Sequence, residues 1–451
     1  MSKRRVFPHT PAEWPFFYGW VVLAVGAMGT LATAPGQTIG VSVFNDFLIE
    51  VLSINRVLLS TAYMIGTTTS AVFLARAGRV LDRRGSRVVG TVAAAGLGLS
   101  IFGMTQIDRA AAGLASVFGG TVIPAAIALS FGFFLLRFFG QGVLMLSSRN
   151  MILKWFDRSR GKVNAILGVT VTLGFSYAPR VFEAVIRAHS WRVAWALVGT
   201  AVLGFAVVAA VFYRDNPTMY GLIPDGPLRD RPKRRRVWVP RRFANLTPIG
   251  ATTGEDRTLG EARKTVTFWV FLLVLTLSSA IGTAFTFHVV SIFETAGLSR
   301  LSAVAVFLPA SVVGIVVKFI SSWASDYVPI RIFPILHAAA LVLHLVAIIV
   351  LRSPATIVLV IVAHGVMQGL LTVNASLAWP RLFGLAQLGT ITGFTMTWTV
   401  IGSAVGPYIF SVFFNLSGSY TLVSIILIPP CLVLAGLAIW AYRRHVPVTR
   451  G

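Results

Sequence analysis

The chain has few cysteines and few charged residues. Its one cysteine, Cys431, lies in an apolar run, so neither a disulfide framework nor a cysteine-based metal cluster is expected. Charged residues are 12% of 451 positions and hydrophobic residues 56%, whereas a soluble domain carries about 25% charged residues. These values exclude an ordinary soluble fold and predict a membrane protein.

Acidic residues are the scarcest charged class. The 15 Asp and Glu residues fall in loops or near the ends of apolar runs, and none follows Asp326. A carrier of cationic drugs generally needs a carboxylate embedded in its spans to pair with the substrate. This pattern therefore argues against multidrug efflux.

Long apolar runs dominate what is present. A spanning helix needs roughly 20 apolar residues. The runs are apolar on every face, which favours helices over a barrel with alternating strands. We predict an all-α membrane protein with twelve transmembrane helices, near 16–38, 57–78, 88–107, 122–148, 162–182, 191–213, 266–288, 301–321, 332–351, 356–376, 389–411 and 420–442.

The basic residues indicate topology. There are 39 Lys and Arg and a net charge of +24, and most lie in the termini and in loops that share one side if both termini are inside. This positive-inside bias predicts a multi-pass protein of a cell inner membrane with both termini cytoplasmic. The first run resembles a signal peptide, but Pro35 directly follows its Ala-x-Ala site, so we expect that span to be retained.

The longest loop divides the chain into two halves. We predict an N-terminal six-helix half at 1–213, a basic cytoplasmic linker at 214–264 and a C-terminal six-helix half at 265–451. The linker contains "RPKRRRVWVPRR", which we interpret as a contact with anionic lipid headgroups rather than with nucleic acid.

The halves repeat in sequence. "GRVLDRRGSR" at 78–87 aligns with "SWASDYVPIR" at 322–331, and the spacing from Gly161 through Gly174 to Pro179 recurs from Gly389 through Gly402 to Pro407. Two parallel six-helix repeats are typical of alternating-access transporters, with substrate held near mid-membrane.

These motifs resemble those of the major facilitator superfamily. The loop signature Gly-x-x-x-Asp-Arg-x-Gly-x-Arg is matched by Gly78, Asp82, Arg83, Gly85 and Arg87, and "RFFGQG" at 137–142 is similar to the fourth-span motif. More narrowly, "FYGWVVLAVG", "KWFDRSRGKVNAILG" and "HSWRVAWALVG" resemble the monocarboxylate transporters and the neighbouring oxalate/formate antiporters.

The loop motif suggests a conformational role. An aspartate at one helix end and arginines on the next loop can form a charge-assisted latch between halves in one access state. We therefore assign gating, not substrate binding, to the five motif residues and to their repeat partners Asp326 and Arg331.

Lys318 is the most informative single residue, because it is the only charge in the run from Ser302 to Ser325. The resembled monocarboxylate family carries an Asp and, four residues later, an Arg in this span, and those positions correspond here to Gly314 and Lys318. The resemblance thus implies a carboxylate ligand at Lys318, without the neighbouring acid. The alternative is that Lys318 reaches the headgroups.

The spans that line the pore in the resembled fold carry further polar candidates. Each is weak alone, since such groups also serve as contacts between helices. We interpret Arg137 as an inter-helix contact and His344 as packing, and the substrate-binding candidates besides Lys318 are Gln37, Tyr63, Arg149, Asn150, His288, His364, Gln368, Asn374 and Trp398.

Together these features predict a monomeric secondary transporter of small organic anions, above all monocarboxylates, and not an enzyme. No cofactor or metal is expected, and the partners are a small carboxylate, the lipid bilayer and, for proton-linked transport, protons. Proton-linked transport and exchange of the oxalate/formate type both stay open. So do import of a neutral or aromatic solute using Trp398 and a non-transporting membrane sensor.

Overall fold

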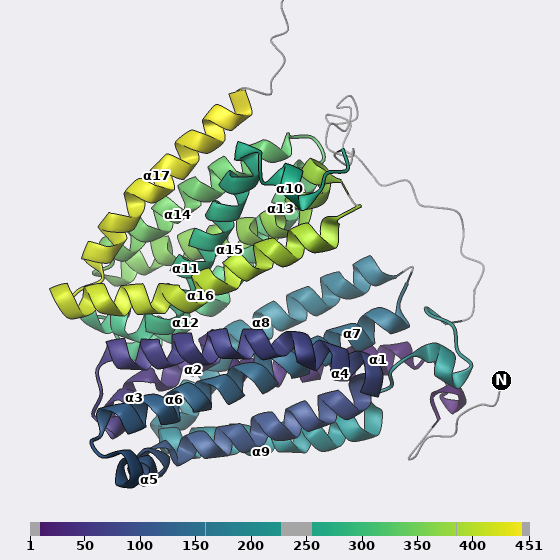
Figure 1. Ribbon diagram of the computed structural model, residues 1–451, viewed down its shortest axis with the longest axis horizontal. Coiled ribbons are helices and arrows are strands. Elements are labelled where there is room, and N and C mark those ends of the chain that lie inside the picture. Colours follow the sequence, from purple (N-terminus) through teal and green to yellow (C-terminus); the bar gives the residue numbers. More distant parts are fainter. Residues whose placement is uncertain (1–9, 158, 227–254, 385, 444–451) are drawn as a thin grey trace, which may run out of the picture. The chain divides into compact units, whose positions relative to one another are not determined.

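The computed structural model describes residues 10–157, 159–226, 255–384 and 386–443, and its regular elements there are all helices (Figure 1). Twelve segments are long and apolar enough to cross a membrane. The predicted all-α class with twelve spans is therefore confirmed. The spans are Gly19–Gly36, Arg56–Leu74, Arg76–Thr105, Val122–Trp155, Gly161–Ala188, Trp191–Phe212, Val266–Thr295, Arg300–Ala324, Ile330–Ile349, Pro354–Phe383, Leu388–Ser417 and Thr421–Tyr442.

The chain forms two compact units, Met1–Pro232 and Lys233–Gly451. The N-terminal unit begins with the short 3₁₀ turn η1 (Pro11–Glu13) and ends with η5 (Pro217–Tyr220). Between them lie α1 (Gly19–Leu31), η2 (Ala34–Gly36), α2 (Thr38–Val41), η3 (Ser42–Phe44), α3 (Asn45–Leu52), α4 (Arg56–Thr105), α5 (Ile107–Phe118), α6 (Val122–Leu136), the π-helical segment η4 (Arg137–Leu144), α7 (Met145–Trp155), α8 (Arg160–Ala188) and α9 (Trp191–Phe212).

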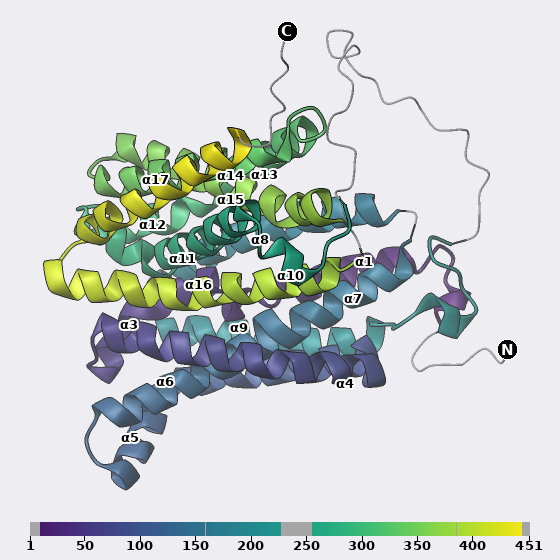
Figure 2. The same ribbon diagram turned by 45° about the horizontal axis from the view of Figure 1, so that its top comes forward.

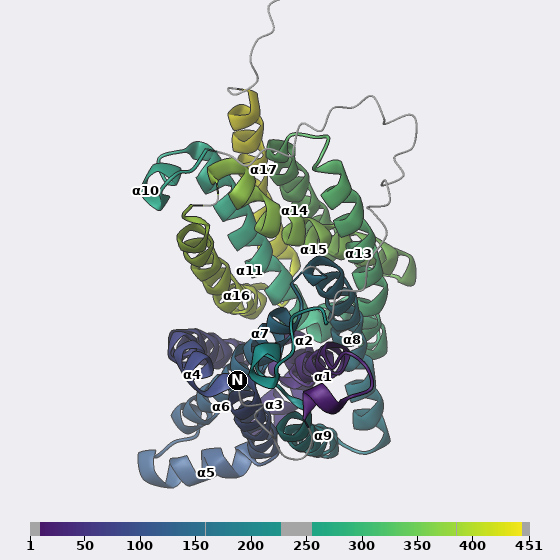
Figure 3. The ribbon, with the colours of Figure 1, turned by 90° about the vertical axis from the view of Figure 1, so that its right-hand side faces the viewer.

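Local sequence explains where these helices begin and break. Pro35 has no backbone N–H, and the first span changes from α1 to the 3₁₀ turn η2 around it. The side chains of Asn55 and Ser190 accept hydrogen bonds from the first turns of α4 and α9. The long helix α4 lies against both α6 and α9 (Figure 3).

The C-terminal unit consists of α10 (Leu259–Ala262), α11 (Val266–Thr295), α12 (Arg300–Ala305), α13 (Phe307–Ala324), η7 (Ile330–Ile332), α14 (Phe333–Ile349), α15 (Pro354–Phe383), α16 (Leu388–Ser417) and α17 (Thr421–Arg443). Helix α15 packs on α13 and α14, and α14 also packs on α17 (Figure 2). Helix α11 packs mainly on α16.

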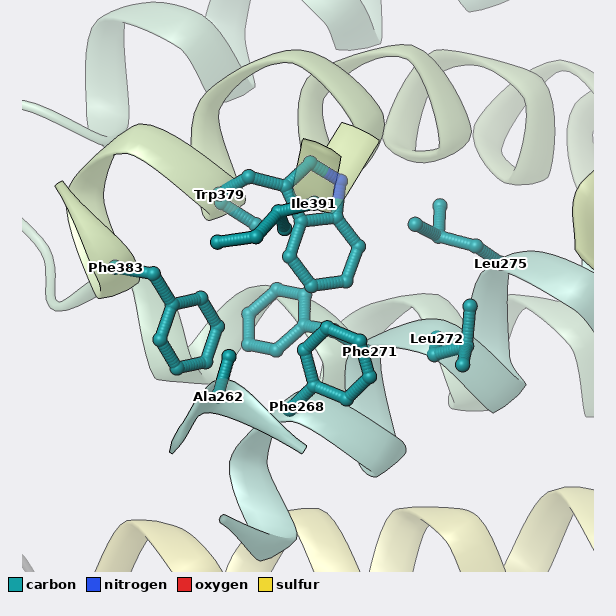
Figure 4. Packing of buried hydrophobic residues seen from close by; sticks show 9 residues of the cluster. Ala262, Phe268, Phe271, Leu272, Leu275, Trp379, Phe383 and Ile391 are labelled. Atoms are coloured by element: carbon teal, nitrogen blue, oxygen red, sulfur yellow. The ribbon is translucent and has the colours of Figure 1, made fainter. Parts of the chain in front are cut away.

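A buried aromatic cluster joins α10, α11, α15 and α16 near one end of this unit (Figure 4). Phe268 contacts the rings of Trp379 and Phe383 at centroid separations of 5.5 and 5.8 Å. Such aromatic packing contributes roughly 0.5–1.5 kcal/mol per pair beyond area burial, so it fixes these helix ends to one another.

The sequence repeat has a structural counterpart. A β-carbon on Gly174 in α8 would lie 2.3 Å from a side-chain carbon of Leu31 in α1, and one on Gly402 in α16 would lie 2.4 Å from the carbonyl oxygen of Thr276 in α11. In each half, then, the fifth span approaches the first span at the corresponding glycine.

The spans predicted at 57–78 and 88–107 are confirmed as separate spans, and the element α4 that contains both is broken by the non-helical residue Gly85. One expectation needs correction. The fifth span extends to Ala188, which places the buried Glu183 inside it rather than at its end.

The predicted linker falls partly outside the described residues, at 227–254. Its flanks pack with the halves beside them. The Asp225 amide donates to the Trp155 carbonyl, and the Arg257 amide donates to the Phe383 carbonyl.

Candidate functional site

The loop motif of the N-terminal unit is built around Gly85 and Asp215. Gly85 has φ +82°, and a β-carbon on it would lie 2.5 Å from a carboxylate oxygen of Asp215. Asp215 accepts a hydrogen bond from the Arg87 amide at 3.0 Å, and the Arg87 guanidinium donates to the Ala210 carbonyl at 2.7 Å. Only glycine combines this dihedral with such a close approach.

The motif residues on either side of Gly85 are more open. Asp82 and Arg83 are exposed, and Gly78 has open space around it. Arg87 binds the sixth span of its own half, and the gating roles assigned to these residues remain predictions.

The C-terminal copy of the motif has a different partner from the expected one. Asp326 binds Arg381, at the end of α15, with a distance of 2.8 Å, and Arg381 also donates to the Ser325 carbonyl. Arg331, the repeat partner of Arg87, lines a small pocket with Ala438 and other residues of α17. The acid therefore pairs with the tenth span instead of with the following loop.

Lys318 lies on a polar side of α13. It is half-buried, and it makes no hydrogen bond or ion pair with the described residues. Since an α-helix turns about 100° per residue, Lys318 shares a side with Ser311 and Ser322. The exposed apolar residues Val316 and Ile320 lie roughly opposite it.

The adjacent face of α13 is closed by α15. A β-carbon on Gly314 would lie 3.2 Å from the Gly365 carbonyl oxygen, and one on Gly369 would lie 2.7 Å from the Gly314 carbonyl oxygen. The backbone of α15 thus occupies the space beside Gly314, where the resembled family has an acid. Lys318 lies about one turn further along α13 from this contact.

Three polar side chains of the N-terminal unit, Arg137, Tyr63 and Thr38, form a cluster, and Gln37 has partners of its own. The Arg137 guanidinium lies 5.2 Å above the Tyr63 ring and 3.3 Å from the Thr38 hydroxyl, which is itself 2.6 Å from the Tyr63 hydroxyl. Gln37 donates to the Thr33 hydroxyl and contacts the Met145 sulfur. Among the described residues no carboxylate pairs with Arg137, whose Nε has no acceptor. The cluster therefore joins spans one, two and four around an uncompensated cation.

Arg149 and Asn150 lie further along the fourth span. Arg149 is exposed and Asn150 half-buried, and neither side chain makes a hydrogen bond within the described part of the chain. The structure does not join them to the Arg137 cluster.

Two candidates of the C-terminal unit already serve contacts between helices. His288 bonds through Nε2 to the Pro407 carbonyl oxygen at 2.9 Å. Asn374 is fully buried and donates to His337 Nδ1 at 3.0 Å, on the neighbouring α14. Their substrate roles stay predictions, but both have local partners.

The last three candidates lie in different surroundings. Trp398 packs against the aromatic cluster of Figure 4. Gln368 is exposed, without a side-chain hydrogen bond, and its oxygen lies 3.7 Å from the position of a β-carbon on Gly282. His364 is buried beside Phe285 and His344.

Comparison with known proteins identifies the family. Residues 109–407 match the family model of the Major Facilitator Superfamily. The chain belongs to this superfamily. No curated protein matches its sequence.

Solved structures of similar fold cover nearly the whole facilitator. The crystal structure of the nucleoside transporter NupG has a TM-score of 0.68 at 11% identity, covering 93% of this chain and 99% of that one. A bacterial homologue of the human lysosomal transporter Spinster, inward-facing and unoccupied, has a TM-score of 0.57 at 12% identity, covering 95% and 93%. Its inward-facing, occupied form has a TM-score of 0.56 at 14% identity, covering 94% and 96%. At these identities the likeness establishes the fold alone.

Sequence reasoning missed several residues of this facilitator. Asp215 and Arg381 are held against the two copies of the loop motif. The neighbour of His344, a residue interpreted above as packing, is His364. The sequence could have indicated Arg381, because it is a lone basic residue at the end of the tenth span. The acid of the second motif copy, Asp326, needs a basic partner of this kind.

Proposed function

We propose that this facilitator carries small organic anions, in particular monocarboxylates, by alternating access. The observation that carries the proposal is that two cations in its spans, the buried Arg137 and the half-buried Lys318, have no carboxylate partner among the described residues. The contrast is Glu183, a buried acid that pairs with Arg187 at 3.3 Å.

A cation of this kind favours an anionic substrate. Removing an ammonium from water is costly unless an opposite charge approaches closely, and Lys318 has no such partner in the described part of the chain. A substrate carboxylate can supply it. One ammonium as a point charge suits one carboxylate better than two.

The position of Lys318 supports binding over headgroup anchoring. The exposed apolar residues Val316 and Ile320 of α13 lie on the other side of the helix, and an apolar face of this kind is suited to lipid. The closer likeness to monocarboxylate transporters and oxalate/formate antiporters belongs to the same proposal, as does an inner-membrane location with cytoplasmic termini.

The alternatives differ in the solute. A nucleoside, the solute named for NupG, represents the neutral aromatic class that Trp398 could contact. Oxalate represents the dicarboxylate exchangers. A sensor would bind a ligand without moving it.

The test combines ligand binding with flux. Purified protein is screened by thermal stability against lactate, pyruvate, oxalate and uridine, because a ligand that binds the native state raises stability by mass action. Counterflow of each solute is then measured in proteoliposomes for wild type, Lys318→Ala, Lys318→Arg and the control Lys264→Ala, which removes an exposed lysine before α11.

We expect stabilisation and counterflow with the monocarboxylates. Lys318→Ala should lose both, Lys318→Arg should retain part of each because the charge survives, and Lys264→Ala should match wild type. Undiminished lactate and pyruvate transport by Lys318→Ala would refute Lys318 as the ligand. If only uridine is bound and transported, the solute is neutral and aromatic rather than an organic anion. Binding of a ligand without flux would indicate a sensor.

A further inference from the structure

Four histidines lie on the described helices of the C-terminal unit, and two of them have hydrogen-bond partners. His337 bonds to Ser278 Oγ at 2.9 Å and to the Asn374 amide at 3.0 Å. His288 bonds to the Pro407 carbonyl oxygen. These two rings act as ordinary contacts between helices.

The other two, His344 on α14 and His364 on α15, lie beside each other and have no hydrogen-bond partner among the described residues. Their ring centroids lie 5.1 Å apart. Both ring nitrogens of His344 and Nδ1 of His364 are buried without a hydrogen-bond partner. A buried polar atom left unpaired lowers stability, and an apolar side chain would fill the same space without that loss. Packing therefore does not account for the pair.

The surroundings of the pair are aromatic. The Phe285 ring lies 4.8 Å from that of His344 and 4.9 Å from that of His364, and the Phe307 ring lies 6.4 Å from that of His364. No charged side chain contacts either imidazole among the described residues. The other titratable groups on the helices packed around the pair are His288 and Glu294 on α11, Lys318 on α13, His337 on α14, Arg381 on α15, and Cys431 and Tyr442 on α17.

We propose that His344 and His364 together form a proton-binding site that links anion transport to proton movement. This inference rests on the proposed function, because it supplies the coupling ion for the carboxylate held at Lys318.

The geometry suits one shared proton. A centroid separation of 5.1 Å is close to one hydrogen-bond length plus two ring radii. A small rotation then lets a protonated ring donate N–H to a bare nitrogen of the other. The face of Phe285 can stabilise the resulting positive charge by a cation–π interaction. The proton binds a nitrogen lone pair on one side of the membrane and leaves it on the other, and no other bond changes.

The position of His364 connects the pair to the rest of the site. Gln368 lies one turn along α15, and residues four apart share a helix face, so His364 and the exposed amide of Gln368 lie on one side of α15. The same stretch of α15 contacts α13 at Gly314 through Gly365 and Gly369, one turn from Lys318. The carboxylate and proton sites therefore lie on helices in direct contact.

The experiment measures uptake of labelled lactate and pyruvate into proteoliposomes, with and without an inward proton gradient, and counterflow at equal pH. The variants are His344→Gln and His364→Gln. His189→Gln, which removes an exposed histidine, is the matched control. His337→Gln tests loss of a buried but hydrogen-bonded ring, judged by its ratio of gradient-driven uptake to counterflow.

We expect wild type to accumulate substrate about tenfold per pH unit, because one pH unit and a tenfold concentration ratio have equal free energy. His344→Gln should lose this accumulation and keep counterflow, and His364→Gln, at a substrate-binding candidate, should lower the ratio of accumulation to counterflow, while His337→Gln and His189→Gln should keep the wild-type ratio. Accumulation retained by both pair variants, or wild-type uptake that ignores the gradient, would overturn the proton site and leave the anion proposal intact.

A substrate-free measurement separates failure of the two proposals. If wild type shows no counterflow with either acid, the anion proposal fails, and a dye titration of purified protein decides the proton site. One more proton taken up by wild type than by the double variant on acidification supports it, and equal uptake refutes it.

Discussion

Gly314 of α13 meets Gly365 of α15 so closely that a β-carbon on Gly314 would lie 3.2 Å from the Gly365 carbonyl oxygen. The contact is reciprocal, since a β-carbon on Gly365 would lie 2.5 Å from the Ala310 carbonyl oxygen. Small residues that let helix backbones approach are a usual way to pack helices in a membrane. The space beside Gly314, one turn from Lys318, is thus occupied by a contact between helices.

This contact predicts an order of sensitivity among glycines. Gly365→Ala should destabilise the protein by about 1–3 kcal/mol, because backbone atoms cannot move aside cheaply. Gly314→Ala should be milder, and Gly436→Ala, with nothing within 4 Å, should be neutral or slightly stabilising because alanine favours helix. Thermal unfolding in detergent gives the order. Equal tolerance of Gly365→Ala and Gly436→Ala would show that α13 and α15 are not in this contact.

The ion pair between Asp326 and Arg381 predicts a modest coupling. Asp326 is 51% exposed, so a double-mutant cycle on Asp326→Ala and Arg381→Ala should give a coupling of about 1 kcal/mol or less in stability. If the pair biases a conformational equilibrium, both variants should lower turnover more than substrate affinity. A changed affinity at constant turnover would assign these residues to binding.

The uncompensated Arg137 predicts opposite effects on stability and activity. Arg137→Gln removes a buried charge that has only weak hydrogen bonds, so stability should stay equal or rise, while transport should fall if the guanidinium attracts the anion. Arg137→Lys should keep part of the activity and lose the stacking on Tyr63. If Arg137→Gln is much less stable but transports normally per folded molecule, Arg137 acts only as a contact between helices.

How far the sequence predicts the molecule depends on the interaction concerned. Twelve spans, two halves and the repeated glycines follow from hydropathy and spacing, which are local or periodic signals. Partners such as Asp215 for Gly85, Arg381 for Asp326 and His344 for His364 lie on different helices. No sequence periodicity relates the two members of each pair, and only the packing of the helices brings them together.

The surroundings of single residues depend on packing that composition does not show. His344 has the same residue type as His337, yet only His337 finds hydrogen-bond partners. Asn374 is a polar residue on a pore-lining span, but its amide is used by α14. The direction in which each side chain points decides these cases.

A capping box before α11 predicts a pH dependence. The Glu261 carboxylate accepts hydrogen bonds from the Thr258 amide at 2.8 Å and its hydroxyl at 3.0 Å, and these bonds hold the pKa of Glu261 below its usual value. A lowered carboxyl pKa adds stability above the unfolded-state pKa, and this is lost as pH falls through the folded-state pKa. The difference in melting temperature between wild type and Glu261→Gln should therefore be present at pH 7 and shrink at low pH. A difference that grows on acidification would contradict the assignment.

The last prediction concerns Gly85, where two independent constraints coincide. Its φ of +82° is unfavourable for any residue with a β-carbon, and a β-carbon there would also collide with the Asp215 carboxylate. Gly85→Ala should therefore cost about 1–3 kcal/mol from the dihedral alone and should also displace Asp215 from the Arg87 amide.

The collision of the β-carbon can be separated from the dihedral strain by removing the Asp215 carboxylate. In an Asp215→Ala background, Gly85→Ala should lose the steric part and keep the dihedral part, so its effect should be smaller but not zero. Stability by thermal unfolding and transport by counterflow are measured for the four proteins, with Gly113→Ala as the control because nothing lies within 4 Å of that helical glycine. If Gly85→Ala has the same effect with and without Asp215, the carboxylate does not constrain the loop and the dihedral alone explains the glycine. If Gly85→Ala behaves like Gly113→Ala, neither constraint operates, and the kink in α4 has another origin.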